Sequence, residues 1–143
     1  MKEYPDCFPK NFASEILPKQ AKEENKSVYR VIKFGEIDEN SFISTYEEIQ
    51  RKLIPPKKHL DLNNPGIYST SCNMEYSEAR NVLDIFMRYY PKPFIAKGET
   101  EKTCGPSQLT SEREARKDTH VDWWIYKNTN PEDYFKKVEN NEE

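Results

Sequence analysis

The sequence predicts an α+β fold, a small curved mixed β-sheet with about three helices packed beside it. Short β-branched or alternating stretches occur in turn with amphipathic, helix-like stretches along most of the chain. Aromatic residues make up 13% of the 143 residues, so rings can supply much of the core although hydrophobic residues reach only 35%. This length fits a single domain. We therefore divide the chain into an N-terminal arm (1–26), one globular domain (27–139) and a flexible tail (140–143).

Four strands are expected, each with its own signal. Residues 28–34 are β-branched and alternate up to Gly35, and residues 119–126 alternate cleanly between apolar and polar side chains. Residues 66–71 follow a turn-forming loop, and residues 93–98 form a short apolar run.

Three helices are expected between and after these strands. In 41–53 and 77–90, apolar residues recur at steps of three and four, and proline follows both stretches. Residues 131–138 begin with proline at the first helical position, after Asn130 as N-cap, and carry acids in the first turn. The long polar stretch 99–118 predicts either a functional lid or a disordered segment.

Charge and cysteine usage narrow the function classes. The chain has 22 Lys and Arg against 25 Asp and Glu, a formal charge of −3, and therefore no strong basic field for a phosphate backbone. No apolar run approaches the length that crosses a bilayer. Three widely spaced cysteines indicate reduced thiols, and the Cys and His residues lack the close pairing of a zinc site. We expect a cytoplasmic protein without bound metal and without a nucleic-acid or membrane partner.

Arg30 is the first candidate binding residue. In the expected strand it points to the same side as Val28 and Ile32, and a guanidinium on an apolar face needs a carboxylate, a phosphate or a ring of carbonyls. A structural ion pair or an edge position would satisfy it, and so would the phosphate of a ligand bound in a cleft. The sequence leaves these alternatives open.

Two short polar motifs follow along the chain. The hydroxyls of Ser69-Thr70-Ser71, at the end of the second expected strand, can donate to a phosphate or ribose, or cap the next turn. In Glu99-Thr100-Glu101, after the third strand, one carboxylate could hold a ribose hydroxyl or stabilise a developing oxocarbenium ion while the other orients a nucleophile. A solvated charged loop is the alternative for this second motif.

These three elements, in this chain order, resemble the Arg / Ser-Thr-Ser / Glu-x-Glu class of the ADP-ribosyltransferase-like fold. Gly66-Ile67-Tyr68 and the helix containing Glu78-Ala79 are also similar to that superfamily. The resemblance implies an NAD- or nucleotide-binding protein, either a transferase that passes ADP-ribose to a macromolecule or a relative that only binds. It implies cofactor binding by Arg30, Ser69, Thr70 and Ser71, and catalysis by Glu101 with Glu99.

The strand at 119–126 supports a second class of function. His120, Asp122, Trp124 and Tyr126 share one side of it, and Trp and Tyr are favoured anchors at interfaces. A small bacterial or phage interaction or inhibitor protein could therefore bind a protein partner through the 99–126 region, with His120, Trp124 and Tyr126 as contacts. His120 and Asp122 could instead join Cys104 in a nucleophilic site.

Overall fold

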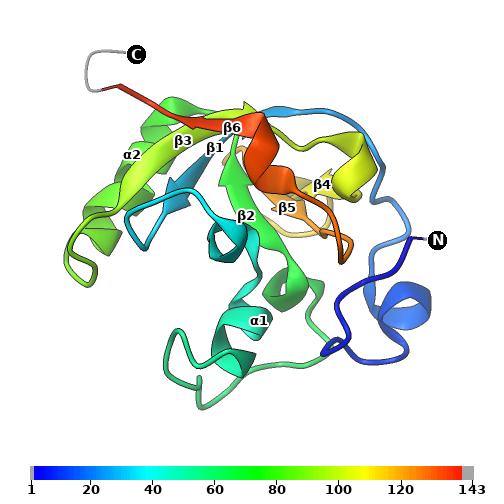
Figure 1. Cartoon of the computed structure of the whole chain (residues 1–143). Coiled ribbons are helices and arrows are strands. Elements are labelled where there is room, and N and C mark those ends of the chain that lie inside the picture. Colours follow the sequence, from blue (N-terminus) through cyan, green and yellow to red (C-terminus); the bar gives the residue numbers. More distant parts are fainter. Residues whose placement is uncertain (1, 140–143) are drawn as a thin grey trace.

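The computed structural model describes residues 2–139, so the expected flexible tail at 140–143 lies outside the described residues. Figure 1 shows one β-sheet with helices beside it, which confirms an α+β fold. The strands are β1 (Ser27–Ile32), β2 (Thr70–Asn73), β3 (Phe94–Glu99), β4 (Ser107–Leu109), β5 (His120–Trp123) and β6 (Phe135–Lys137). The α-helices in this part of the chain are α1 (Thr45–Gln50) and α2 (Tyr76–Phe86).

The strand order in the sheet is β4-β5-β2-β1-β3-β6, and every neighbouring pair is antiparallel. The expectation of a mixed sheet was therefore wrong. Consecutive strands β2 and β3 do run in the same direction, but β1 lies between them and pairs with both. The expected curvature is not confirmed, because the sheet is not strongly curled.

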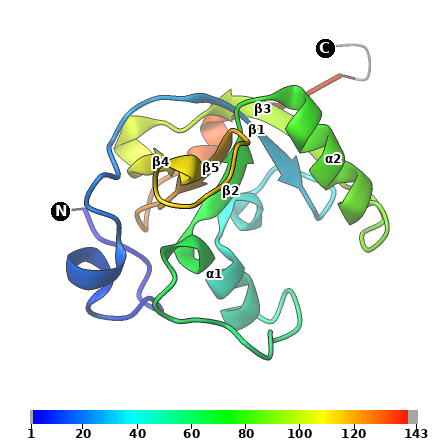
Figure 2. The ribbon, with the colours of Figure 1, turned by 180° about the vertical axis from the view of Figure 1, so that it is seen from behind.

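The two faces of the sheet are covered differently. One face carries the main core, in which Val28, Val121 and Trp123 are fully buried and Phe42 packs against them. On the opposite face, α2 packs against β1 and β3 through its apolar stripe of Ala79 and Leu83. Figure 2 shows α2 over this side of the sheet, while the segment that follows β4 lies beside β5. On this face, the region around β2 lies between α2 and the segment that follows β4.

The N-terminal arm contributes an aromatic cluster of its own. Phe8, Phe12 and Ile16 are buried against Tyr68 and Trp124. Ring contacts such as Phe12–Tyr68, with centroids 5.2 Å apart, connect the arm to the segment before β2. The described part of the arm therefore packs on the sheet-forming region rather than extending from it.

The second expected strand, 66–71, begins later than the sequence indicated. Pro65–Tyr68 forms a 3-10 helix, because the Asn64 side chain accepts a hydrogen bond from the Gly66 amide (2.9 Å) and proline occupies the first helical position. β2 then takes residues 70–73.

The expected helix 41–53 is divided in two. A 3-10 helix, Glu39–Phe42, ends where the carbonyls of Ser41 and Phe42 accept hydrogen bonds from the Arg30 and Thr70 side chains. Ser44 then caps α1 by accepting from the Glu47 amide at 3.1 Å. Hydrogen bonds from distant side chains to these two carbonyls thus interrupt the continuous helix that the sequence predicted.

The helix expected at 131–138 is wrong beyond its first turn. Pro131–Tyr134 is a 3-10 helix, and the chain then pairs with β3 as β6. Gly98 explains the close approach, since a Cβ at this position would lie 2.6 Å from Cγ of Phe135. The stretch 99–118 is likewise ordered into β4 and two 3-10 helices, Lys102–Cys104 and Thr110–Glu112.

Candidate functional site

Arg30 lies in the main core, on the same side of β1 as Val28 and Ile32, as the alternation predicted. Its Nε donates to the Ser41 carbonyl (3.0 Å) and its Nη1 donates to the Ser71 carbonyl (2.8 Å). Within residues 2–139, no carboxylate lies at ion-pair distance from it. Peptide carbonyls therefore satisfy this guanidinium, which ties β1 to β2 and to the 3-10 helix before α1.

Glu99 and Glu101 lie away from Arg30. In the β1–β3 register Arg30 is opposite Ala96 whereas Glu99 is opposite Ser27, an offset of three residues or roughly 10 Å along the strands. The Asn25 amide donates to both carboxylates, at 3.2 and 3.4 Å. The structure brings the two acids together with Asn25 and does not bring them to Arg30.

The Ser69–Ser71 segment is divided between the two faces of the sheet. The Thr70 hydroxyl points into the main core and donates to the Phe42 carbonyl. Ser69 is buried on the other face, where its Oγ lies 2.5 Å from Oδ1 of Asp122. Ser71 shares that face and is exposed to solvent.

Asp122 is the centre of a buried polar cluster on this face. Its side chain is 2% exposed, and it accepts hydrogen bonds from the hydroxyls of Ser69 and Thr110 (2.8 Å). Nη2 of Arg113 lies 2.7 Å from Oδ2, a close ion pair whose angle departs from that of a hydrogen bond. A buried carboxylate requires such compensation, and the cluster supplies it from two separate segments of the chain, the residue before β2 and the turn after β4.

Gln108 extends the cluster onto β4. It is 2% exposed, it lies directly opposite Asp122 in the sheet, and its Oε1 accepts from Nη1 of Arg113 at 3.0 Å. Its Nε2 is buried and has no hydrogen-bond partner in the described structure. An unsatisfied buried amide is costly, so a hydrogen-bond acceptor placed against this donor would be stabilising.

His120 is joined to Asp122 through Thr110. Nδ1 of His120 lies 2.6 Å from the Thr110 hydroxyl, which itself donates its single proton to Asp122. The histidine must therefore donate from Nδ1, and Nε2 carries the lone pair. Burial, opposed by Asp122, lowers the pKa of His120 below its usual value, which favours the neutral imidazole at pH 7.

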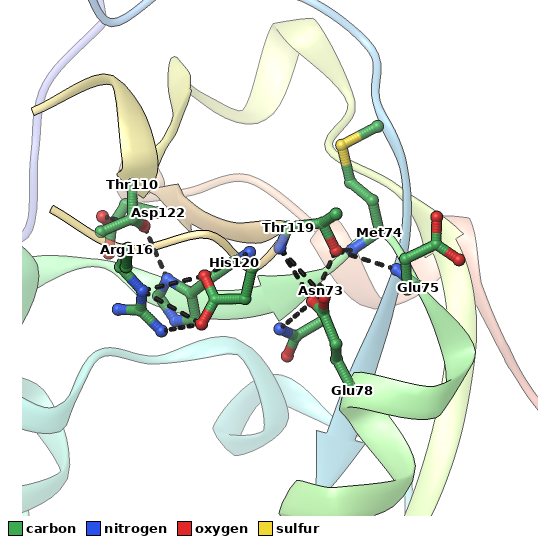
Figure 3. Close-up of polar contacts among 10 residues, drawn as sticks. Asn73, Met74, Glu75, Glu78, Thr110, Arg116, Thr119, His120 and Asp122 are labelled. Atoms are coloured by element: carbon green, nitrogen blue, oxygen red, sulfur yellow. Dashed lines mark hydrogen bonds and ion pairs between the residues drawn. The ribbon is translucent and has the colours of Figure 1, made fainter. Parts of the chain in front are cut away.

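A second network joins the 110–119 segment to the start of α2 (Figure 3). The Glu78 carboxylate accepts from the Thr119 amide (2.9 Å), the Thr119 hydroxyl (2.6 Å) and the Asn73 side chain (3.1 Å). The Thr119 oxygen in turn accepts from the amides of Met74 and Glu75, both at 3.1 Å. Thr119 thus ties the residues just before α2 to a distant segment, and its neighbour His120 is held in place.

Ser71 is the uncovered position of this face. It pairs directly with Asp122 on a central strand, and its neighbours Ser69, Asn73 and Asp122 are all buried. Side chains in the middle of a sheet are normally covered by the layer above. Ser71 is exposed, and no hydrogen bond of its hydroxyl is found among residues 2–139. The surface around Ser71, His120 and Gln108 is therefore the candidate site.

The thiols take no part in this site. Cys104 packs in the main core with Val121 and Trp123, on the opposite side of β5 from His120, and burial raises its pKa. Burial also raises the pKa of Cys72 to about 12. The structure therefore does not assemble Cys104, His120 and Asp122 into a nucleophilic site.

Two of the expected partner-binding residues are engaged in contacts within the protein, and one of them is internal. The Trp124 side chain is fully buried, and its Nε1 donates to the Pro65 carbonyl at 2.9 Å. Tyr126 is half-buried, and its hydroxyl donates to Glu23 at 2.7 Å. Of the three, His120 alone belongs to the candidate site.

Sequence reasoning missed Gln108, Thr110 and Arg113, which lie in the stretch expected to be a lid or a disordered loop. Alternation over Ser107-Gln108-Leu109 was the available signal for a short strand. No sequence signal fixed the position of Arg113 over the Trp124 ring, at 5.6 Å from its centroid.

Residues 2–139 contain no group of three or more His, Cys, Asp or Glu side chains arranged to hold a metal ion. No helix in the same range combines the length and apolar character needed to span a membrane. Comparison of the chain with protein-family models, with curated proteins and with solved structures yields no match.

Proposed function

We propose that this chain binds a nucleotide-type ligand, with NAD as the first candidate, on the uncovered part of the sheet around Ser71. The observation that carries the proposal is the exposure of Ser71 on a central strand among buried polar neighbours. The ADP-ribosyltransferase-like fold remains a proposal that rests on the order of the sequence motifs alone.

The chemistry of the surrounding groups supports a polar ligand. The Ser71 hydroxyl and the Gln108 amide are hydrogen-bond donors without partners in the described residues, and Nε2 of His120 is an acceptor. The charges of Arg113 and Asp122 offset one another, so the site suits the hydroxyl and amide groups of a ligand.

The proposal covers binding and does not extend to transfer of ADP-ribose. Arg30 is committed to carbonyl oxygens, and the Glu99–Glu101 segment is held by Asn25 at the end of β3. Accordingly, Ser71 keeps the ligand-binding role that the sequence predicted, His120 takes a new role, and Gln108 is a new site residue.

Isothermal titration calorimetry with NAD, ADP and nicotinamide tests this proposal. We expect binding by the wild type, and a Ser71→Tyr substitution should abolish it because the ring would cover the site. Ser14→Tyr, on the exposed surface of the arm, is the matched control and should bind as the wild type does. Absence of binding by the wild type, or equal affinity of the Ser71→Tyr variant, would contradict the proposal.

Protein binding is a second candidate function, favoured by exposed apolar side chains near the end of α2. Ile85 is 50% exposed, Met87 59% and Tyr89 73%. Clustered exposed apolar residues often mark interaction sites. This surface differs from the 99–126 region that the sequence indicated.

A photo-crosslinking amino acid at position 89 tests this second function. We expect a discrete crosslinked product that is lost on Ile85→Ser substitution, and none from the same probe at the exposed arm residue Lys19. Equal products from both positions would mean that the apolar surface has no specific partner.

A further inference from the structure

We propose that Ser71 and His120 form a nucleophile–base pair that cleaves small esters, with Thr110 and Asp122 as positioning residues. This activity uses the same surface as the proposed nucleotide site but does not depend on the identity of that ligand.

The first step in the argument is the state of His120. Because the Thr110 hydroxyl donates its hydrogen bond to Asp122, the imidazole donates from Nδ1 and keeps its lone pair on Nε2. Nε2 has no partner in residues 2–139, and it is not among the buried atoms that lack one, so it reaches solvent. A neutral histidine with an accessible Nε2 is a competent general base.

The second step is the rigidity of that base. Asp122 holds the imidazole through Thr110, as the orienting carboxylate of a catalytic triad holds its histidine, but with one hydroxyl inserted. The His120 amide also donates to Asp118 at 3.3 Å, and Asp118 is itself paired with Arg116 at 2.6 Å. Both the backbone and the side chain of His120 are therefore anchored.

The third step places the nucleophile beside the base. In the β2–β5 register Ser71 is opposite Asp122 and Asn73 is opposite His120, so Ser71 and His120 are diagonal neighbours on one face. Diagonal neighbours in an antiparallel pair have Cα atoms roughly 7–8 Å apart, within reach of an aromatic side chain and its partner. Oγ of Ser71 and Nε2 of His120 are not hydrogen-bonded to each other here, and catalytic hydrogen bonds often form only when substrate binds. A nucleophile beside a base that a third group orients is the signature of covalent catalysis.

The fourth step supplies a donor for the developing oxyanion. Gln108 and Ser71 both pair with Asp122, from opposite sides of β5, so their Cα atoms are about 10 Å apart, two strand spacings. Gln108 shares the sheet face of Asp122 and Ser71, and its Nε2 is buried without a partner in the described residues. An amide donor beside the nucleophile is the group that stabilises a tetrahedral intermediate.

The reaction balances without a cofactor. Oγ of Ser71 forms a bond to the ester carbonyl carbon while its proton passes to Nε2 of His120. The carbon–alkoxide bond breaks, and the alcohol leaves with that proton. Water then attacks the acyl-serine, again losing a proton to His120, and the carboxylic acid departs as Ser71 recovers its hydrogen.

A fluorophosphonate probe tests the pair directly, because fluoride is its leaving group and the serine adduct is stable. Peptide mass spectrometry should place the adduct on Ser71, and Ser71→Ala should remove it. His120→Gln should slow labelling by about 100-fold or more, the usual contribution of a general base. Ser77→Ala, at an exposed position on α2, is the control and should label as the wild type does.

Two outcomes would overturn the proposal. One is the absence of an adduct on Ser71 in a folded wild type. The other is an adduct that forms equally fast in His120→Gln and in Thr110→Val, each shown to be folded by circular dichroism. Labelling that proceeds in a protein that binds no nucleotide would leave this proposal standing and contradict only the nucleotide proposal.

Discussion

Arg30 has a structural role in the main core that its position on an apolar strand face already suggested. Its guanidinium donates hydrogen bonds to the carbonyls of Ser41 and Ser71, in place of the main-chain amides that usually fill this role in helices and sheets. Buried peptide oxygens need donors, so the cation is retained where an aliphatic side chain would leave them unpaired.

Replacement of Arg30 by alanine should therefore destabilise the protein. Each carbonyl left without a donor costs about 1–3 kcal/mol, so we expect a loss of about 2–6 kcal/mol in the free energy of unfolding. Urea denaturation measures it. Arg30→Lys, which keeps one cationic donor, should lose less than Arg30→Ala, and equal stability of all three proteins would refute the assigned role.

His120 makes stability depend on pH in a defined direction. Its pKa is lowered in the folded protein, chiefly by burial, although Asp122 and Asp118 act to raise it and Arg116 and Arg113 act to lower it. The unfolded chain consequently binds the proton more readily. The stability that neutral His120 contributes is fully present above the pKa of the unfolded state, about 6.5. It is lost as the pH falls through the lower pKa of the folded state.

We therefore expect the free energy of unfolding to fall between pH 7.5 and pH 5. Chemical denaturation at the two pH values measures this fall in the free energy of unfolding. The fall should be smaller in the His120→Gln variant. The same substitution at His59, which is exposed, is the control and should leave the pH dependence unchanged. An identical pH dependence in His120→Gln and the wild type would contradict the prediction.

At the scale of elements, strands with a strong local pattern were predictable and those decided by tertiary pairing were not. β1 and β3 follow their β-branched and apolar runs closely. The segment before β6 begins with a helix-start signal at Asn130-Pro131, and it forms one helical turn, Pro131–Tyr134. After this turn, burial of Phe135 and pairing with β3 favour a strand over a longer helix. No local sequence pattern reveals these tertiary contacts.

The candidate site shows the same limit. Alternation correctly separated His120 and Asp122 from Val121 and Trp123 on β5. The partners of the Asp122 carboxylate come from the turn after β4 and from the residue before β2, and their convergence depends on strand order. The sequence therefore indicated which face was polar but not which residues complete it.

Gly98 provides a test at this scale. An alanine Cβ here would overlap Phe135 and the backbone before it, so Gly98→Ala should displace β6. The amide of Val138, which donates to the Ile95 carbonyl at 2.8 Å, should then exchange with deuterium much faster. Lys136→Ala, an exposed change on β6, is the control; unchanged exchange in Gly98→Ala would contradict the close packing.

For the whole molecule, the arm is part of the packed structure that supports the site. Phe12 is 2% exposed and contacts Tyr68, and both share a cluster with Trp124, the ring beneath Arg113. The arm thus supports the indole on which Arg113 lies. Low hydrophobic content did not prevent this packing, because aromatic rings supply the buried surface.

Phe12→Ala should accordingly reduce stability by about 3–5 kcal/mol, the usual cost of truncating a buried phenylalanine. Thermal and urea denaturation measure the change, with Lys10→Ala on the exposed side of the arm as the control. A loss as small as that of the control would show that the arm packs without contributing to the stability of the fold.

The central claim is that the sheet is uncovered at Ser71, and thiol reactivity tests it most directly. In a Cys7→Ser background, which removes the exposed native thiol, single Ser71→Cys and Ser69→Cys variants are treated with a small maleimide. The account predicts rapid modification of the Ser71→Cys variant and slow modification of the Ser69→Cys variant, since Ser69 is buried. Equal protection of both variants in the folded protein would contradict it.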